Sequence, residues 1–192
     1  ILSDTSVNAV SLLNLGKLQL YSYQDQYVVA AEAYTPYYKT ETRVDYDFYG
    51  NPYPSTYQVF GGYNYYDLIL AGFDADGSMV WDNDFPMKGL LSSTNEQKSS
   101  VYIDTAQINL AYVNNGQIFT QDINGPVDLD KLEKVSIVSR FKRDKSVEST
   151  ESHILYWYKK YFLVYGYQKM RNRSLNDKSI RTIFYVNKLA FE

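Results

Sequence analysis

Short runs in which apolar and polar residues alternate follow one another along the chain, separated by Gly, Asn and Asp. Alternation with a period of two places one side of a β-strand in a core and the other side in solvent. No stretch keeps the 3.6-residue apolar period of an amphipathic helix over three turns, although residues 128–134 could form one or two helical turns. The pattern therefore predicts an all-β fold.

Three of the predicted strands have the same shape, and their spacing indicates a repeat. Each begins with two polar or small residues and continues with apolar and small ones, over residues 25–34, 106–115 and 159–168. Aligned on Val29, Leu110 and Leu163, the second and third strands lie 53 residues apart, whereas the first and second lie 81 apart. The excess of 28 residues is close to the length of a tyrosine-rich stretch that follows Tyr34.

The flanking strands repeat in the same order. One strand precedes each of the three, in residues 17–24, 99–105 and 153–159. Another strand follows each of them, in residues 66–77, 117–125 and 181–191, and a fourth follows twice, in residues 78–85 and 134–141. The last unit thus ends after its third strand. We expect an orphan strand at residues 6–15 to supply the missing fourth strand of that unit.

Four-stranded meanders repeated in this way are typical of β-propellers, in which each blade buries its faces against its neighbours. Three blades do not close a ring, because propellers have about four to eight. We therefore expect a single all-β repeat domain over residues 1–192. It would be half of a larger propeller-type ring completed by a second copy, or the C-terminal part of a longer protein. The alternative fold is a β-sandwich.

The stretch that interrupts the repeat has the pattern of a hairpin inserted at about residues 37–63. Ten of the 33 residues from Tyr34 to Tyr66 are tyrosine. Such a hairpin is not self-supporting in water, so it either covers the body or binds a partner or ligand. Tyrosine offers a large rigid apolar area with one polar group. We therefore predict a contact surface near the hairpin tip, formed by Tyr46, Tyr49, Tyr53 and Tyr57.

Composition and charge exclude several classes of function. The chain has no cysteine and a net charge of −3, so neither disulfides nor thiol chemistry are expected. Basic residues gather only in residues 140–145 and 169–173, which we interpret as solvated loops, and no nucleic-acid partner is expected. No apolar run approaches the roughly 20 residues of a membrane helix, so no membrane span is expected.

Two pairs of carboxylates are the strongest candidates for site chemistry. Asp74 and Asp76 have a spacing found among calcium ligands, but the apolar residues that follow favour a tight turn at Gly77. Asp82 and Asp84 share one face of a strand. They could serve a glycoside hydrolase or lyase, or they could keep an outer strand solvated.

No other motif indicates catalysis. His153 is the sole histidine, and the chain contains neither a G-x-S-x-G nucleophile motif nor a nucleotide-binding glycine motif. Asn115 and Gly116 form a second turn signal at the same place in the next unit. We therefore predict no catalytic residue, no metal ligand and no cofactor.

Residues 73–85, "FDADGSMVWDNDF", resemble the strand–DG–strand–Trp hairpin in blades of PQQ-type bacterial propellers. The PQQ cofactor does not carry over, because the vicinal cysteines and most of the tryptophans are missing. Together with residues 110–123, 156–170 and 184–192, this segment is similar to the C-terminal part of uncharacterised β-rich envelope proteins of Bacteroidetes-type bacteria. The resemblance implies an exported, extracytoplasmic protein: periplasmic, on the outer-membrane surface or secreted. A chain that starts at Ile1 rather than Met fits a removed leader or a longer precursor.

These observations lead to one functional hypothesis with two alternatives. We expect a non-catalytic binding or assembly module of the bacterial envelope or cell surface. Its partner would be a protein bound through the tyrosine-rich hairpin, or a second copy that completes the ring. The first alternative is a carbohydrate-binding module with a glycan stacked on the tyrosines, and the second is a glycosidase or lyase.

Overall fold

The computed structural model describes residues 13–139, 141, 143–172 and 180–190, and all of their regular structure is β-strand. The predicted all-β class is confirmed. No helix occurs in these ranges, so residues 128–134 do not form the helical turn that the sequence allowed.

The strands form three antiparallel sheets, none of which closes on itself within the described ranges. The first sheet contains β1 (Asn14–Leu15), β2 (Gln19–Tyr23), β3 (Gln26–Tyr46), β4 (Pro52–Phe73) and β5 (Met79–Ser92). The second sheet contains β6 (Ser99–Ile103), β7 (Ile108–Asn114), β8 (Gln117–Asn124), β9 (Val127–Asp128) and β10 (Glu133–Ser136). The third sheet contains β11 (Lys145–Tyr158), β12 (Tyr161–Arg171) and β13 (Arg181–Ala190).

Apart from the two-residue strands β1 and β9, strands that follow one another along the chain are neighbours within each sheet. The first sheet runs β2-β3-β4-β5, the second runs β6-β7-β8-β10, and the third runs β11-β12-β13. This order is that of the strands in the three sequence units. Short turns enforce it: Asn115 and Gly116, with φ of 49° and 73°, join β7 to β8 in the left-handed conformation that two-residue hairpins need.

The N-terminal strand does not complete the third sheet. We expected residues 6–15 to do so, but residues 6–12 lie outside the described ranges, and Asn14 and Leu15 pair with β3 in the first sheet. The prediction is therefore wrong for the described part of this strand. Alternation identifies a strand but not its neighbour, and β2 covers β3 only as far as Ala30, which leaves the next stretch of β3 open to β1.

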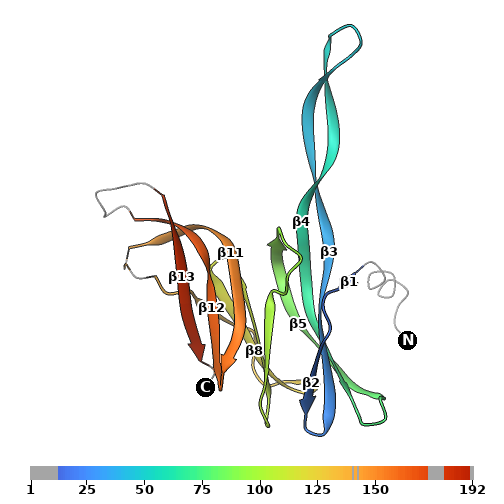
Figure 1. Cartoon of the computed structure of the whole chain (residues 1–192), viewed down its shortest axis with the longest axis vertical. Helices are drawn as coiled ribbons and strands as arrows, with labels where there is room; N and C mark the ends of the chain where they lie inside the picture. Colours follow the sequence, from blue (N-terminus) through green and yellow to red (C-terminus); the bar gives the residue numbers. More distant parts are fainter. Residues whose placement is uncertain (1–12, 140, 142, 173–179, 191–192) are drawn as a thin grey trace.

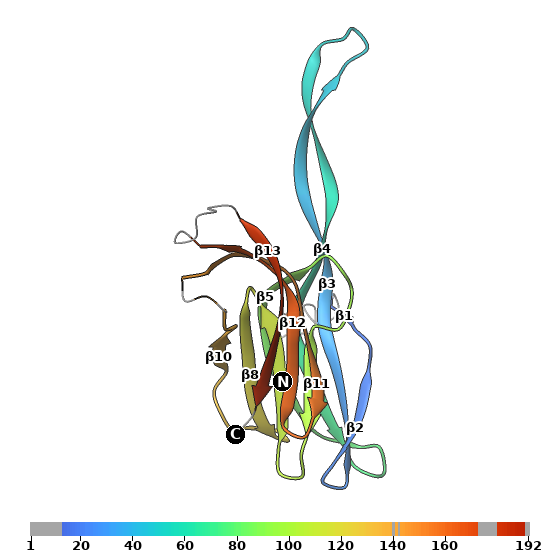
Figure 2. The same cartoon turned by 60° about the vertical axis from the view of Figure 1, so that its left-hand side comes forward.

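The second sheet lies between the first and the third (Figures 1 and 2). Its strand β7 is buried along nearly its whole length. Leu110 and Tyr112 belong to the core shared with the first sheet, whereas Ala111 and Val113 belong to the core shared with the third. Successive side chains of a strand point to opposite faces, so a strand packed on both faces is apolar along most of its length.

Two cores hold the three sheets together. The first sheet contributes large buried side chains to one core: Val28, Leu68, Leu70, Trp81 and Phe85. The third sheet contributes buried side chains to the other core: Ile154, Phe162, Val164 and Tyr185. Each core is therefore formed between two sheets and not within one.

Strands β3 and β4 continue beyond the first sheet as a projecting hairpin (Figure 1). Their neighbour β5 ends at Ser92, which pairs with Tyr63. Next to this point, Gly62 has a φ of +129° beside a register shift between the two strands, and a Cβ there would lie 2.4 Å from the carbonyl oxygen of Ser92. Because a β-bulge bends a strand and increases its twist, the hairpin leaves the sheet here.

Candidate contact surface on the projecting hairpin

Beyond Tyr37, the hairpin strands pair only with each other. Their register is unbroken from the Tyr38–Phe60 pair to the Tyr46–Pro52 pair, and no described strand pairs with them as a third neighbour. Figures 1 and 2 show the hairpin standing clear of the three sheets. It therefore does not cover the body, which was one of the two interpretations that the sequence allowed.

Cross-strand pairing sorts the hairpin side chains into a neutral face and a charged face. The neutral face carries Tyr38, Thr40, Thr42, Val44 and Tyr46 opposite Phe60, Gln58, Thr56, Pro54 and Pro52. The charged face carries Lys39, Glu41, Arg43 and Asp45 opposite Val59, Tyr57, Ser55 and Tyr53. The hairpin thus presents one face without any charge.

The charges on the charged face neutralise one another. Glu41 accepts from Lys39 at 2.7 Å and lies 3.6 Å from Arg43. The guanidinium of Arg43 lies 5.6 Å from the ring centroid of Tyr57, whose hydroxyl donates to Asp45. Exposed ion pairs of this kind contribute about 0–1 kcal/mol to stability. Because these groups already have partners, the neutral face is the better candidate for an apolar contact.

Asp47 organises the turn at the hairpin tip. Its Oδ1 atom accepts from the N–H groups of Tyr49 at 2.9 Å and Asn51 at 2.8 Å, and Gly50 turns the chain with a φ of +83°. The side-chain amide of Asn51, which donates to Oδ2 of Asp47 at 3.0 Å, does most to hold the pKa of Asp47 below its usual value, and the backbone N–H groups lower it further. The rings of Phe48 and Tyr49 are 97% and 86% exposed and meet edge to face at 5.5 Å. The turn therefore presents two aromatic rings to solvent.

A row of aromatic rings connects the hairpin to the core. Tyr65 is buried, and the ring of Tyr34 lies 5.6 Å from it and 5.7 Å from the ring of Tyr63. Phe60 continues the row at 5.1 Å from Tyr63, and Tyr38 follows at 5.8 Å from Phe60. Aromatic pairs contribute about 0.5–1.5 kcal/mol each beyond their burial, so the base of the hairpin is anchored.

The four predicted contact tyrosines do not form one surface. Tyr53 and Tyr57 lie four residues apart on the charged face, with Ser55 between them, whereas Tyr46 lies on the neutral face and Tyr49 lies in the turn. Sequence reasoning missed Phe48, the most exposed aromatic residue of the hairpin. The four tyrosines therefore divide into a tip group, which Phe48 joins, and two groups on opposite faces.

The turn at Asp74 is built like the hairpin tip. Asp74 Oδ1 accepts from the N–H groups of Asp76 at 3.0 Å and Ser78 at 2.9 Å, and Gly77 has a φ of +82°. The predicted tight turn is thus observed. The described ranges contain no group of three or more His, Asp or Glu residues placed to hold a metal ion. The two turns share an Asp-x-x-Gly sequence, in which Phe48 of the hairpin tip occupies the position of the exposed Ala75. This shared spacing is the signal in the sequence that could have predicted the exposure of Phe48.

The other candidate residues lie in different sheets. Asp82 and Asp84 are exposed on the outer face of the first sheet. Asp67 lies nearby, and burial raises the pKa of its carboxyl, which the charge of Asp84 raises further. His153 belongs to the third sheet and stacks on Tyr165 at 5.2 Å. The structure therefore does not bring the histidine and the carboxylates together.

Glu32 is a buried carboxylate that links the first sheet to the second. Its Oε1 atom accepts from the N–H of Lys98 at 2.8 Å and from the N–H and hydroxyl of Ser99 at 2.6 Å each. Burial raises the pKa of Glu32, although these hydrogen bonds act in the opposite direction. Its role is structural, because its donors stand at the start of β6.

No protein-family model, no curated protein and no solved structure matches this chain. No helix in the described part of the chain is long and apolar enough to cross a membrane.

Proposed function

We propose that this chain is a non-catalytic binding module whose projecting hairpin contacts a protein partner. The observation that supports it best is the position of the hairpin, which holds Phe48 and Tyr49 in solvent and far from both cores. Aromatic residues that are exposed in the free protein and buried in a complex dominate the energetics of many protein interfaces. A structural role inside this chain would not need such a long arm.

The neutral face of the hairpin suits a protein partner. It offers Tyr38, Val44 and Tyr46 along one side with only uncharged residues between them. Pro52 and Pro54 lack backbone N–H groups, so β4 has two hydrogen-bond donors fewer along its length. Proline at the edge of a sheet disfavours pairing with an additional strand. We infer that a partner packs on this face and around the tip rather than adding a strand along β4.

We further propose that the body is a propeller-type array of an exported bacterial envelope protein. The support is the repeated strand order in the three sheets and the packing of the second sheet on both sides. The envelope location rests on the resemblance of residues 73–85, 110–123, 156–170 and 184–192.

Carbohydrate binding is the second candidate function. It is favoured by Tyr53 and Tyr57, which lie four residues apart on one face and are both exposed. Exposed aromatic rings beside polar groups suit stacking on sugars. Arg43 and Asp45 already contact Tyr57, however, so a sugar would have to displace them. We therefore rank this function below protein binding.

Site-specific photocrosslinking tests the proposed function. A benzophenone amino acid replaces Phe48 or Tyr49 in the tip, and Val127, exposed in β9, serves as the matched control. Irradiation of the producing cells is expected to give one discrete protein adduct from both tip positions and none from position 127. The proposal is overturned if folded chains crosslink to no protein from the tip, or equally from all three positions.

A glycan array separates the two candidate functions. Carbohydrate binding predicts retention of the wild-type chain on one glycan class and loss of that signal in Tyr53→Ala and Tyr57→Ala. Protein binding through the tip predicts no glycan signal, together with the protein adduct.

A further inference from the structure

The outer face of the third sheet is apolar and exposed. Phe162 and Val164 of β12 point into the core, so the residues that alternate with them point away from the second sheet. We define the basic end face by six exposed residues of this side, which also carries the exposed Glu151: Leu155, Trp157, Tyr167, Phe184, Val186 and Lys188. Lys188 lies 3.5 Å from the ring centroid of Tyr161, within the aromatic part of this face.

The outer face of the first sheet is apolar along one side and acidic along the other. Val28 and Leu70 point into the core, so their neighbours in sequence point outward. We define the acidic end face by six residues of this side: Leu20, Tyr27, Phe73, Met79, Asp82 and Asp84. Asp82 and Asp84 pair with Ala71 and Ile69, so carboxylates border the apolar residues directly.

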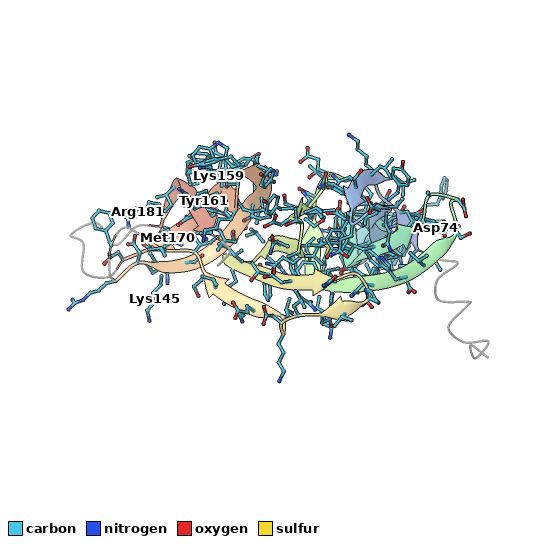
Figure 3. All side chains as sticks on the ribbon, turned by 90° about the horizontal axis from the view of Figure 1, so that it is seen from below. Asp74, Lys145, Lys159, Tyr161, Met170 and Arg181 are labelled. Carbon is cyan, nitrogen blue, oxygen red and sulfur yellow. The ribbon has the colours of Figure 1, made fainter. Side chains whose placement is uncertain are left out.

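The two end sheets carry opposite charge. Residues 13–36 and 61–92, which form the first sheet without its hairpin, contain seven acidic and two basic side chains. Residues 145–172 and 180–190, which form the third sheet, contain seven basic and two acidic side chains. Figure 3 shows Asp74 at one end of the stack and Lys145, Lys159 and Arg181 at the other. The net charges of the two sheets are thus equal and opposite, and they belong to opposite ends of one chain.

The sheets also converge along one side. β2 and β11, the first full strands of the two end sheets, both contact β6, the first strand of the second sheet. Sheets that meet at their first strands spread outward from a common side. In propellers, sheets arranged in this way are repeated around a central axis.

Repeat arrays normally end in sheets with polar outer faces, because an apolar end is poorly soluble. Here both ends are apolar. We propose that the basic end face of one copy packs on the acidic end face of a second copy, so that the chain assembles head to tail with itself. Two copies that each use both faces would form a closed ring of six sheets. This inference does not involve the hairpin, so it stands or falls independently of the proposed function.

Charge complementarity is what selects a second copy in this orientation. Packing of two basic end faces, or of two acidic ones, would bring like charges together, and like-charge juxtaposition disfavours a contact. The head-to-tail arrangement pairs an acidic border with a basic surface and buries apolar side chains from both. Its affinity should fall as salt rises, because salt screens exposed charges.

Sedimentation velocity on the full chain tests the proposal. The wild type is expected to sediment as a closed pair of chains, with a dissociation constant that rises at least tenfold between low and high salt. Val186→Glu on the basic end face and Leu20→Glu on the acidic end face should each give monomers. Val44→Glu, the same substitution at an equally exposed hairpin position, should behave as the wild type.

Mixing the two monomeric variants decides the orientation. Val186→Glu keeps an intact acidic end face and Leu20→Glu keeps an intact basic end face, so a head-to-tail contact predicts an open pair in the mixture. A contact between identical faces would leave one of the two variants paired on its own. Thermal unfolding of each variant shows that loss of association is not loss of fold.

Several results would overturn the proposal. They are a wild-type chain that stays monomeric at its highest soluble concentration, a variant that pairs alone, or a mixture that contains no pair. A monomer that binds a hydrophobic dye at its end faces would assign these faces to a different partner and would likewise contradict self-assembly.

Discussion

Truncation of Leu110 in the middle sheet gives the sharpest test of the three-sheet packing. Leu110 is fully buried and belongs to the core between the first and second sheets. Leu→Ala substitutions at such sites cost about 2–5 kcal/mol, because the lost transfer free energy adds to the cost of the cavity. For a chain of this length, 1 kcal/mol corresponds to about 2–4 °C in Tm. Leu110→Ala should therefore lower Tm by roughly 4–20 °C.

Trp81 reports on the same core. It is 8% exposed, and its ring nitrogen donates to Gln26 at 2.7 Å, so its fluorescence should shift to longer wavelength when the first two sheets separate. Urea unfolding followed by this signal should show the midpoint lowered by about 1–2 M, taking an m-value of about 2–3 kcal/mol per M. Val44→Ala on the exposed hairpin is the matched control and should change stability by less than about 0.5 kcal/mol. If Leu110→Ala and Val44→Ala had the same midpoint, the first and second sheets would not pack face to face.

Three further predictions follow from individual residues. Burial raises the pKa of Glu32 above its ordinary 4.5, so its contribution to stability is present below pH 4.5 and is lost as pH rises through the folded-state pKa. Glu32→Gln cannot titrate and should therefore gain stability relative to the wild type as pH rises through this range. Urea titrations of both proteins at several pH values measure this difference. Burial likewise raises the pKa of Tyr112 to about 12, so Tyr112→Phe should lose less stability than the wild type between pH 10 and 12; equal losses would contradict the burial of this hydroxyl. A Cβ at Gly72 would lie 2.2 Å from the ring of Trp81, so Gly72→Ala should cost about 1–3 kcal/mol and shift tryptophan fluorescence, and an unchanged Tm would show that the ring does not pack there.

The strands and their order could be predicted from the sequence because each unit combines local alternation with short turns. β12 shows why: in "YFLVYGYQ" every second residue, beginning with Phe162, faces the core, as a period of two requires. The turn at Asn115 and Gly116 could be predicted for the same reason, since its conformation depends only on adjacent residues.

The relations between sheets could not be predicted in this way. The apolar run in β7 indicates a buried strand, but it does not say that one half of its side chains meets the first sheet and the other half the third. The neighbour of the N-terminal strand was predicted wrongly for the same reason, because pairing depends on which part of β3 is left open. The opposite charges of the end sheets acquire meaning only when the order of the stack is known.

The hairpin has features that could be predicted from the sequence and features that could not. Its alternation predicts two faces, and Gly50 and the two prolines predict the turn region. Its projection from the body depends on where β5 ends and on the bulge beside Gly62, and the alternation of the hairpin strands specifies neither. The exposure of Phe48 follows from the hydrogen bonds of Asp47, which no periodicity reveals.

Excision of the hairpin tests most directly whether it is the contact device of this protein. Residues 40–58 are replaced by Asn-Gly, which suits a two-residue hairpin turn between the paired residues Lys39 and Val59 and leaves both cores intact. The measurement is the amount of the partner protein, identified beforehand by crosslinking from the tip, that co-purifies without irradiation with the excised chain and with the wild type. We expect at least a tenfold loss of the partner with an unchanged Tm. Full retention by the excised chain would contradict the proposed role of the hairpin.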